Sequence, residues 1–302
     1  MVANLESNLL IILGPTASGK TRVGVQVAKV LGGEIISADS RQVYRRMDIG
    51  TGKDLGEYGT VPYHLIDIVE PGHEFNVFEF HRRFGEAFTN IRARGRLPIL
   101  VGGTGMYLDA VLRGYRLAEV PENPALRREL LPLTLEELAA RLKKSSPSLH
   151  NTTDLLSRER LVRAIEIAES NEEKNQDEPP LHELWPVVFG LKWPRNVLRQ
   201  RITQRLRERL KGGLIEEVDR LHKAGVSFGA LEFYGLEYRF VARFLKGELS
   251  KNDMFQKLNS AIHQLAKRQD TWFRRMERQG IGIHWVVGGK DAAEGILKIL
   301  KM

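Results

Sequence analysis

Cysteine is absent from the 302 residues of this chain. Its absence excludes disulfide bridges, thiolate metal sites and a cysteine nucleophile, and it is compatible with a reducing cytoplasm, where we expect the protein to act. The sequence also lacks an apolar run long enough to cross a bilayer and an N-terminal signal segment, so we expect no membrane partner. No internal repeat or low-complexity tract is evident. The remaining composition, 42% hydrophobic, is enough for a sizeable core.

Positive charge is in moderate excess, with 46 Lys and Arg against 38 Asp and Glu and a net charge of +8. This excess permits many anionic partners, nucleic acid among them, without selecting one. Its distribution is more informative, because basic residues crowd one predicted helix whose apolar positions repeat every four residues. The apolar positions are Leu198, Ile202, Leu206 and Leu210; the basic residues are Arg195, Arg199, Arg201, Arg205, Arg207, Arg209 and Lys211.

A second basic cluster lies near the end of a long predicted helix. Here Lys267, Arg268, Arg274 and Arg275 surround the aromatic pair at 272–273. Basic residues interleaved with aromatics suit a phosphate backbone with unstacked bases nearby. The alternative for both helices is a solvated face on which acidic residues balance part of the charge.

Residues 14–21 read GPTASGKT and fit the phosphate-binding pattern GxxxxGK[ST]. An apolar run at 9–13 precedes them, and valines at helical spacing follow until the glycines at 32–33. This strand–loop–helix setting is what the motif requires. We expect the backbone to wrap a diphosphate or nucleotide phosphate, with Lys20 on the outer phosphate and Thr21 on a Mg²⁺ ion; a glycine-rich turn without ligand is the alternative. The predicted phosphate-binding residues are Gly14, Pro15, Thr16, Ala17, Ser18, Gly19, Lys20 and Thr21.

The strand predicted at 97–101 lacks the acid with which many nucleotide hydrolases hold Mg²⁺ at this place. It ends instead in two glycines and Thr104, where a bulky group can approach the backbone closely. The acid follows the strand predicted at 34–38, as Asp39. Because residues just past the carboxyl ends of parallel strands line one crevice, we expect Asp39, Thr104 and the phosphate loop to face one another.

The coarse pattern is α/β units, then helices, then a return to strand. It predicts a phosphate-loop α/β core over 1–114, a helical insertion over 115–180 and a return to the core over 181–302, which ends in a strand and a helix. Further strands are predicted at 63–69 and 186–191, and an amphipathic helix at 77–91. Thr134 and Glu137 form a capping-box signal within the insertion, and residues 171–180 are a charged loop that ends in proline.

Seven segments together resemble, in order, the motif series of the tRNA dimethylallyltransferases. They are GPTASGKT, ISADSRQVY, MDIGTGK, LVGGTGMYL, RLVRAIEI, RITQRLRERLKGG and QLAKRQDTWFRR, and the match runs from Leu9 to Trp285. The resemblance implies transfer of a dimethylallyl group from dimethylallyl diphosphate to N6 of the adenosine immediately 3′ of the anticodon, with release of diphosphate. It implies a parallel-sheet, kinase-like phosphate-loop core with a helical insertion that clamps the tRNA anticodon stem-loop. We also expect a monomer.

The reaction suggests roles for individual residues. The adenine N6 amine is a poor nucleophile, so a carboxylate that takes its proton would help, and Asp39 is placed for this role. Thr104 would hold the amine or the base. Lys20, Mg²⁺ on Thr21 and an arginine from position 201 or 205 (Arg201 or Arg205) would neutralise the leaving diphosphate. The alternatives are that Asp39 caps a turn and that Thr104 caps the helix that begins near position 106.

The target adenosine must leave its stack to reach such a pocket. By resemblance, the residues that touch the tRNA are Asp39, Ser40, Arg41, Gln42, Thr104, Arg127, Arg160, Arg163, Lys267, Arg268, Gln269 and Arg274. Arg163 with Glu166 also fits a structural ion pair. Two departures from the family pattern weaken predicted tRNA contacts: Leu236 stands where an aromatic is expected, and Asn151 and Asp154 are apart where an adjacent pair is expected.

Two other functions share part of these features. A small-molecule kinase would use the same loop with Mg²⁺ and ATP, and Asp39 would activate an acceptor hydroxyl; it does not explain the turn at Thr104 or the arginine-rich helices. An RNA-binding module that lost activity would not need Lys20, Thr21, Asp39 and Thr104 together.

Overall fold

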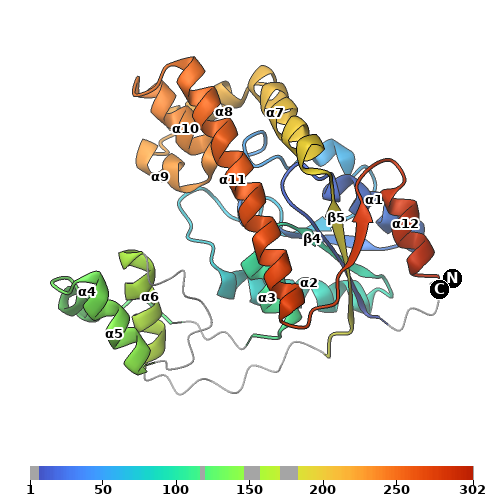
Figure 1. Ribbon diagram of the computed structural model, residues 1–302, viewed down its shortest axis with the longest axis horizontal. Helices are drawn as coiled ribbons and strands as arrows, with labels where there is room; N and C mark the ends of the chain where they lie inside the picture. Colours follow the sequence, from blue (N-terminus) through green and yellow to red (C-terminus); the bar gives the residue numbers. More distant parts are fainter. Residues whose placement is uncertain (1–6, 116–119, 146–156, 171–182, 302) are drawn as a thin grey trace. The chain divides into compact units, whose positions relative to one another are not determined.

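The computed structural model describes residues 7–115, 120–145, 157–170 and 183–301 (Figure 1). The chain forms two compact units. One consists of residues 1–115 with 181–302, and the other of residues 116–180. The second unit is thus inserted into the sequence of the first, and each is described by itself below. The loop predicted at 171–180, Asn151 and Asp154 lie outside the described residues.

The first unit is built on a six-stranded sheet in the order β3-β2-β4-β1-β5-β6. Every pairing in it is parallel, so the strands end at one common edge. The apolar runs predicted as strands near positions 9, 34, 98 and 186 are all present. The strands are β1 (Leu9–Leu13), β2 (Glu34–Ala38), β3 (Tyr63–His64), β4 (Pro98–Gly102), β5 (Pro186–Lys192) and β6 (His284–Val287).

The predicted strand at 63–69 is wrong over most of its length. β3 contains two residues, because Leu65 and Asp67 adopt left-handed backbone angles (φ 61° and 56°) that no strand continues through. After this turn the chain runs beside residues 42–44 instead, with an isolated bridge between Tyr44 and Val69. Leu65, Ile66 and Val69 therefore fill the core from a bent segment.

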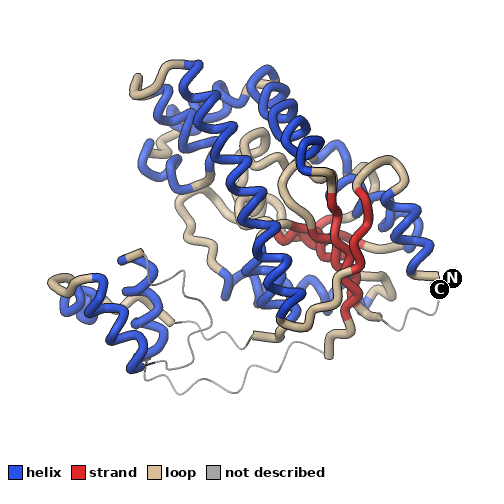
Figure 2. The backbone as a smooth tube through the Cα atoms, viewed as in Figure 1, coloured by secondary structure: helices blue, strands red, loops and turns tan. Residues whose placement is uncertain are grey.

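Helices cover both faces of the sheet, as expected for a parallel sheet whose central strands are buried on both sides. α1 (Lys20–Leu31) and α12 (Ala292–Ile299) belong to one apolar cluster with side chains such as Leu10 and Ile99. On the opposite face α2 (Val77–Ala93) and α3 (Gly105–Leu112) pack on side chains such as Ile36 and Leu100. The result is a three-layer α/β core (Figures 1 and 2). A short 3-10 helix, η1 (Leu55–Glu57), precedes β3.

After β5 the chain continues as a run of helices (Figure 2). They are α7 (Arg195–Lys211), α8 (Leu214–Lys223), α9 (Phe228–Phe233), α10 (Leu236–Leu245) and the long α11 (Lys251–Arg278). α7 and α11 share an apolar cluster that includes Ile202, Leu206, Leu258 and Ile262 together with Ala17 of the phosphate loop. The four-residue apolar repeat of α7 therefore packs this helix directly over the loop.

The second unit contains α4 (Pro124–Leu130), α5 (Leu135–Ser145) and α6 (Arg158–Glu169) around a small leucine-rich cluster. The predicted capping box is confirmed: the Thr134 backbone N–H donates to the Glu137 carboxylate (2.7 Å), and the Glu137 N–H donates to the Thr134 hydroxyl (3.3 Å).

Candidate active site

The phosphate loop lies between β1 and α1, at the edge where the strands end. Gly14 has no room for a side chain, because a Cβ there would approach the Ser18 Oγ to 2.8 Å. Gly19 precedes α1 with a left-handed φ of 88°, which glycine adopts without strain. The buried Ser18 Oγ has no hydrogen-bond partner among the described residues. A buried hydroxyl without a partner is uncommon in proteins, and an anion in the loop would supply one.

Lys20 is the first residue of α1 and lines the cavity described below. Burial lowers the pKa of Lys20 to about 8, Asp39 opposes this shift, and Arg205 and Arg209 add to it. A lysine held in this way among cations is poorly stabilised in the empty protein. A bound diphosphate would restore its charge.

Asp39 and Thr104 follow neighbouring strands, β2 and β4, and their turns are in direct contact. The Thr104 N–H donates to the Ala38 carbonyl (3.2 Å), and the Ser40 N–H donates to the Thr104 Oγ1 (3.1 Å). A Cβ on Gly103 would lie 3.5 Å from the Lys20 Cε, so this turn rests against the phosphate loop. The sheet thus brings the acid, the hydroxyl and the loop to one place.

The alternative roles considered for Asp39 and Thr104 have different outcomes. Thr104 precedes α3, but its side chain makes no hydrogen bond that caps this helix; its hydroxyl is turned to the β2 side instead. Asp39 does cap a turn, because its Oδ1 accepts the Arg41 N–H (2.9 Å). One carboxylate oxygen therefore fixes the orientation of the group, and Oδ2 takes no part in this turn contact.

Three arginines spaced four residues apart on α7 face the phosphate loop; we call Arg201, Arg205 and Arg209 the inner row. The Arg201 Nε donates to the Ala17 carbonyl (2.9 Å), Arg205 pairs with Asp54 (2.6 Å) and Arg209 pairs with Glu237 (3.0 Å). With Lys20, Thr21 and acidic residues of the segment 48–57, they line a cavity of about 970 Å³. Arg201 and Arg205 are the two candidates for neutralising the leaving diphosphate. Arg201 contacts the phosphate loop, whereas Arg205 is paired with Asp54.

Sequence reasoning missed Trp193, which follows β5 and supports both Arg201 and the loop. Its Nε1 donates to the Ser18 carbonyl (2.9 Å), and the Arg201 guanidinium lies 4.4 Å from its ring centroid, a cation–π distance. A side chain on Gly288 would overlap the Trp193 indole. A tryptophan just before the arginine-rich helix was the only sequence signal, and it does not reveal these contacts.

Gln269, predicted to touch tRNA, has another place in this structure. Its Oε1 accepts the Thr16 N–H (2.8 Å) and its Nε2 donates to the Gly103 carbonyl (2.9 Å), so it ties the phosphate loop to the turn after β4. Its neighbours Lys267 and Arg268 are exposed on α11. Arg274 is also exposed, 3.8 Å from Asp270. These three residues, and Gln269 itself, remain predicted tRNA contacts.

The segment after Asp39 divides into surface and core residues. Gln42 is buried, where it accepts from the Ser37 hydroxyl (3.0 Å) and donates to the Gly52 carbonyl (3.1 Å). From there it supports the segment at 47–53, and its contact with tRNA stays a prediction. Ser40 and Arg41 are partly exposed, and the Arg41 guanidinium lies 5.3 Å from the Phe233 ring centroid.

Of the three predicted tRNA-binding arginines of the second unit, Arg127 and Arg163 form ion pairs within that unit. Glu166 is buried and accepts two hydrogen bonds from Arg127 (2.7 and 3.0 Å) and one from Arg163 (3.1 Å). Arg163 also donates to the Val120 carbonyl (2.6 Å). The ion pair expected between Arg163 and Glu166 is therefore present. Arg160 is exposed on α6; the tRNA contacts of all three stay predictions.

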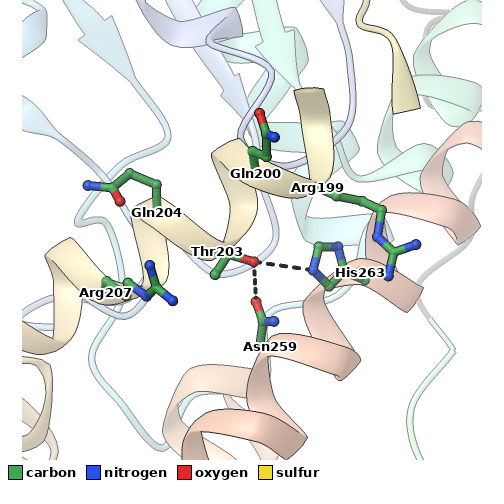
Figure 3. Close-up of a pocket in the computed structure, with 7 residues that line it drawn as sticks. All are labelled: Arg199, Gln200, Thr203, Gln204, Arg207, Asn259 and His263. Atoms are coloured by element: carbon green, nitrogen blue, oxygen red, sulfur yellow. Dashed lines mark hydrogen bonds between the residues drawn. The ribbon is translucent and has the colours of Figure 1, made fainter. Parts of the chain in front are cut away.

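The opposite face of α7 carries a second row of polar residues beside α11 (Figure 3). Here Arg199, Thr203 and Arg207, the outer row, line a groove of about 450 Å³ with Asn259 and His263. The Thr203 hydroxyl donates to the Asn259 Oδ1 (3.0 Å) and lies 3.5 Å from the His263 Nε2. Burial and then the charge of Arg199 lower the pKa of His263. Among the residues lining this groove, all within the described chain, there is no carboxylate.

A phosphate loop beneath a row of arginines, with an acid and a hydroxyl at the neighbouring strand ends, defines an enzyme that moves a group from a phosphorylated donor. Two family models match the chain, one described as IPP transferase over residues 42–276 and one described as isopentenyl transferase over residues 7–58. The protein belongs to the IPP transferase family. None of the described helices is long and apolar enough to cross a membrane.

Similar proteins agree with this assignment. A tRNA dimethylallyltransferase of Geotalea uraniireducens is 65% identical over 99% of this chain and 98% of its own length, and one of Syntrophotalea carbinolica is 66% identical over 98% and 99%. A crystal structure of a tRNA isopentenylpyrophosphate transferase from Bacillus halodurans superposes with a TM-score of 0.70 at 32% identity, over 98% of this chain and 95% of that one. A eukaryotic dimethylallyltransferase that acts on tRNA shares the fold at 22% identity, with a TM-score of 0.72 over 97% of this chain and 78% of that one.

Proposed function

We propose that this protein transfers a dimethylallyl group from dimethylallyl diphosphate to N6 of the adenosine immediately 3′ of the anticodon in tRNA, and releases diphosphate. The observation that carries this proposal is the contact between the Asp39 and Thr104 turns beside the phosphate loop, without an acid at the end of β4. The names and high identity of the relatives support the same reaction. We further propose that the protein acts as a monomer in the cytoplasm, where its tRNA substrate resides.

The donor's diphosphate would occupy the phosphate loop. Backbone N–H groups of the loop, Lys20 and Arg201 would bind its oxygens and stabilise the charge that develops as the bond from the prenyl carbon to oxygen breaks. The loop is held ready for this by Trp193 and Gln269, which fix its Ser18 carbonyl and Thr16 N–H. Little reorganisation is then needed when the charge appears.

A Mg²⁺ ion would bind in the cavity only together with the diphosphate, because the described residues contain no cluster of three acidic or histidine side chains that could hold a metal ion. Thr21, Asp48, Asp54 and Glu57 line the cavity, and burial together with Asp54 raises the pKa of Glu57, a strain that a cation would relieve. Oxygen donors of this kind suit Mg²⁺. Thr21, with the diphosphate, would hold the ion, and the ion would neutralise part of the leaving group's charge.

The acceptor would enter from the side of Asp39 and Thr104. The N6 amine attacks the prenyl carbon, so a C–N bond forms as the C–O bond breaks, and the amine proton passes to the Asp39 Oδ2. The Thr104 hydroxyl accepts the Ser40 N–H, which leaves its own proton to donate to the base. Adenosine reaches this place only when it is flipped out of its stack.

Mass spectrometry of tRNA after incubation with dimethylallyl diphosphate tests the proposal directly. We expect a single added prenyl group on the nucleoside 3′ of the anticodon, and no modification when that adenosine is replaced by guanosine. ATP turnover is measured in parallel. Rapid ATP hydrolysis without RNA, or phosphate transfer to a small acceptor, would support a kinase instead.

A further inference from the structure

The buried carboxylate of Glu217 holds the segment Met47–Lys53. Residues of this segment line the cavity of about 970 Å³ beside the phosphate loop, which we call the donor cavity. Three successive backbone N–H groups, those of Asp48, Ile49 and Gly50, donate to the side chain of Glu217 at 2.9, 2.8 and 3.0 Å. Glu217 lies in the first turn of α8 and is 3% exposed. Consecutive N–H groups that converge in this way form an anion-binding nest, and here the anion is the protein's own carboxylate.

A fourth donor completes this arrangement. The Tyr238 hydroxyl of α10 donates to the Glu217 Oε1 (2.7 Å), and burial, with the nearby Glu217, raises the pKa of Tyr238 well above its usual range, so the phenol keeps the proton it donates. The Tyr238 ring lies so close to Gly50 that a Cβ at position 50 would overlap it. Gly50 is therefore required, because the Tyr238 ring that supports Glu217 occupies the space a side chain would need.

The other side of the same segment holds arginines of the inner row. The Gly50 carbonyl accepts a hydrogen bond from Arg209 (3.3 Å), and the Gly52 carbonyl accepts one from Arg205 (3.4 Å). Gly52 has a left-handed φ of 62°, and a Cβ there would overlap Arg209. Three N–H groups of the segment thus face Glu217, while two of its carbonyls, those of Gly50 and Gly52, face the cations of the donor cavity.

We propose that Glu217 is a positioning residue for the donor: through this segment it sets where Arg205 and Arg209 stand for the diphosphate. Glu217 makes no contact with the donor cavity itself. Its carboxylate orients the backbone N–H groups of residues 48–50, and the carbonyls of Gly50 and Gly52 in the same segment then orient the guanidinium groups of Arg209 and Arg205. The inference rests on the proposed function only in taking the cavity as the diphosphate site.

Calorimetric binding of inorganic diphosphate, with Mg²⁺ present, tests this inference without any prenyl transfer. Glu217→Gln replaces one acceptor oxygen by an N–H₂ group that cannot accept from the segment. We expect it to weaken diphosphate binding about tenfold, the ratio that corresponds to one hydrogen bond to a charged group. In the steady state the KM for dimethylallyl diphosphate should rise by a similar factor, while the KM for tRNA stays within about twofold.

The matched control is Glu216→Gln, which removes an exposed carboxylate from the same turn of α8 and should leave both constants unchanged. Tyr238→Phe keeps the carboxylate and removes one donor, so it should shift diphosphate binding in the same direction by a smaller factor; it decides the question if Glu217→Gln does not fold. A folded Glu217→Gln with wild-type diphosphate affinity, or with equal rises in both KM values, would overturn the inference.

These outcomes separate the inference from the proposed function. If the wild-type protein binds diphosphate but does not prenylate tRNA, and Glu217→Gln still weakens that binding, the positioning role stands and the assigned reaction fails. If the wild-type protein prenylates tRNA and Glu217→Gln behaves as the control does, the reaction stands and the positioning role fails.

Discussion

The two faces of α7 carry the same kind of residue in different surroundings. Arg201, Arg205 and Arg209 of the inner row each meet an acceptor on the phosphate loop, the segment 47–57 or α10. Arg199 and Arg207 of the outer row line a groove without a carboxylate, and Arg207 lies 5.9 Å from the Phe255 ring centroid. Residue type alone does not separate the two rows; what each face packs against does.

The two rows differ in the free-energy cost of keeping their guanidinium groups charged. Burial lowers the pKa of both Arg201 and Arg209, and the charge of Arg205 lowers both further. Neighbouring cations that are partly removed from water repel one another more strongly than exposed ones. We therefore expect the inner row, and not the exposed arginines of the outer row, to bind a multiply charged anion. Substitutions in the two rows, at Asp39 and Lys20, and among the exposed charges of α11 test this contrast.

The largest effect should come from Asp39, whose charge acts on Lys20 of the phosphate loop. Asp39→Asn keeps the shape and the turn contact of this side chain but removes its ability to take a proton. We expect single-turnover prenylation to slow by about 10²–10⁴-fold, the usual worth of a positioned general base. Affinity for tRNA should stay within a few-fold. Near-normal turnover of the variant would mean that the amine proton goes elsewhere.

The next largest effect should separate the rows directly. Arg201→Ala removes a cation that touches the loop and should lower kcat/KM for the donor by about 10²–10³-fold, as the loss of one charge-stabilising donor does elsewhere. Arg199→Ala, half a turn away on the same helix, should change it less than about twofold. Thermal unfolding of both variants checks that the loop has kept its fold. Equal losses from the two variants would remove the distinction between the faces.

The pH dependence of donor binding should report the titration of Lys20, which lines the same cavity as the inner row. Because its pKa in the empty protein is lowered to about 8, Lys20 loses its charge as the pH rises through that value, and diphosphate affinity should fall up to tenfold per unit above it. The stability of the empty protein should move the other way. The unfolded chain binds more protons between pH 8 and 10.5, so Lys20 contributes stability that rises with pH there. Lys20→Met should abolish both trends.

The smallest effect should come from exposed charge on α11. Lys267→Ala and Arg268→Ala should each weaken tRNA binding a few-fold, and a true phosphate contact should flatten the log–log salt dependence by about one unit, or somewhat less on single-stranded RNA. Adjacent helical residues point in different directions, so one of the two should give the larger change. Donor binding should not respond. Unchanged slopes in both variants would place this surface with the outer row, as hydrated charge.

The sequence predicts well the features that depend on residues adjacent in the chain or on the geometry of a parallel sheet. The phosphate loop and α1 follow from a local pattern, and the meeting of Asp39 with Thr104 follows from the common edge of parallel strands. The supports of the site do not follow in this way. Trp193 reaches a carbonyl 175 residues away, Glu217 an N–H 168 residues away and Gln269 an N–H 253 residues away.

Other contacts escape the sequence for the same reason. The positions of Gln42 and Gln269 in the family motifs predict a contact with tRNA, and they do not reveal that both amides also join segments of the core. Leu236 stands where the family pattern has an aromatic, and that pattern does not reveal that the buried Tyr238, two residues later, supports Glu217. The sequence of α7 places basic residues on several faces of the helix. Which of these residues are covered follows only from the packing of α7 on the phosphate loop.

The central place of β1 in the sheet bears on how the chain is synthesised. β1 pairs with β4 on one side and with β5 on the other, and β5 leaves the ribosome about 175 residues later. At roughly 5–20 residues per second, β1 waits about 9–35 s for this second neighbour. Until then Leu9–Leu13 is an apolar strand with an open edge, which invites pairing between nascent chains. Slow elongation across the inserted unit should therefore lower the yield of folded protein, and a chaperone that covers this edge should restore it.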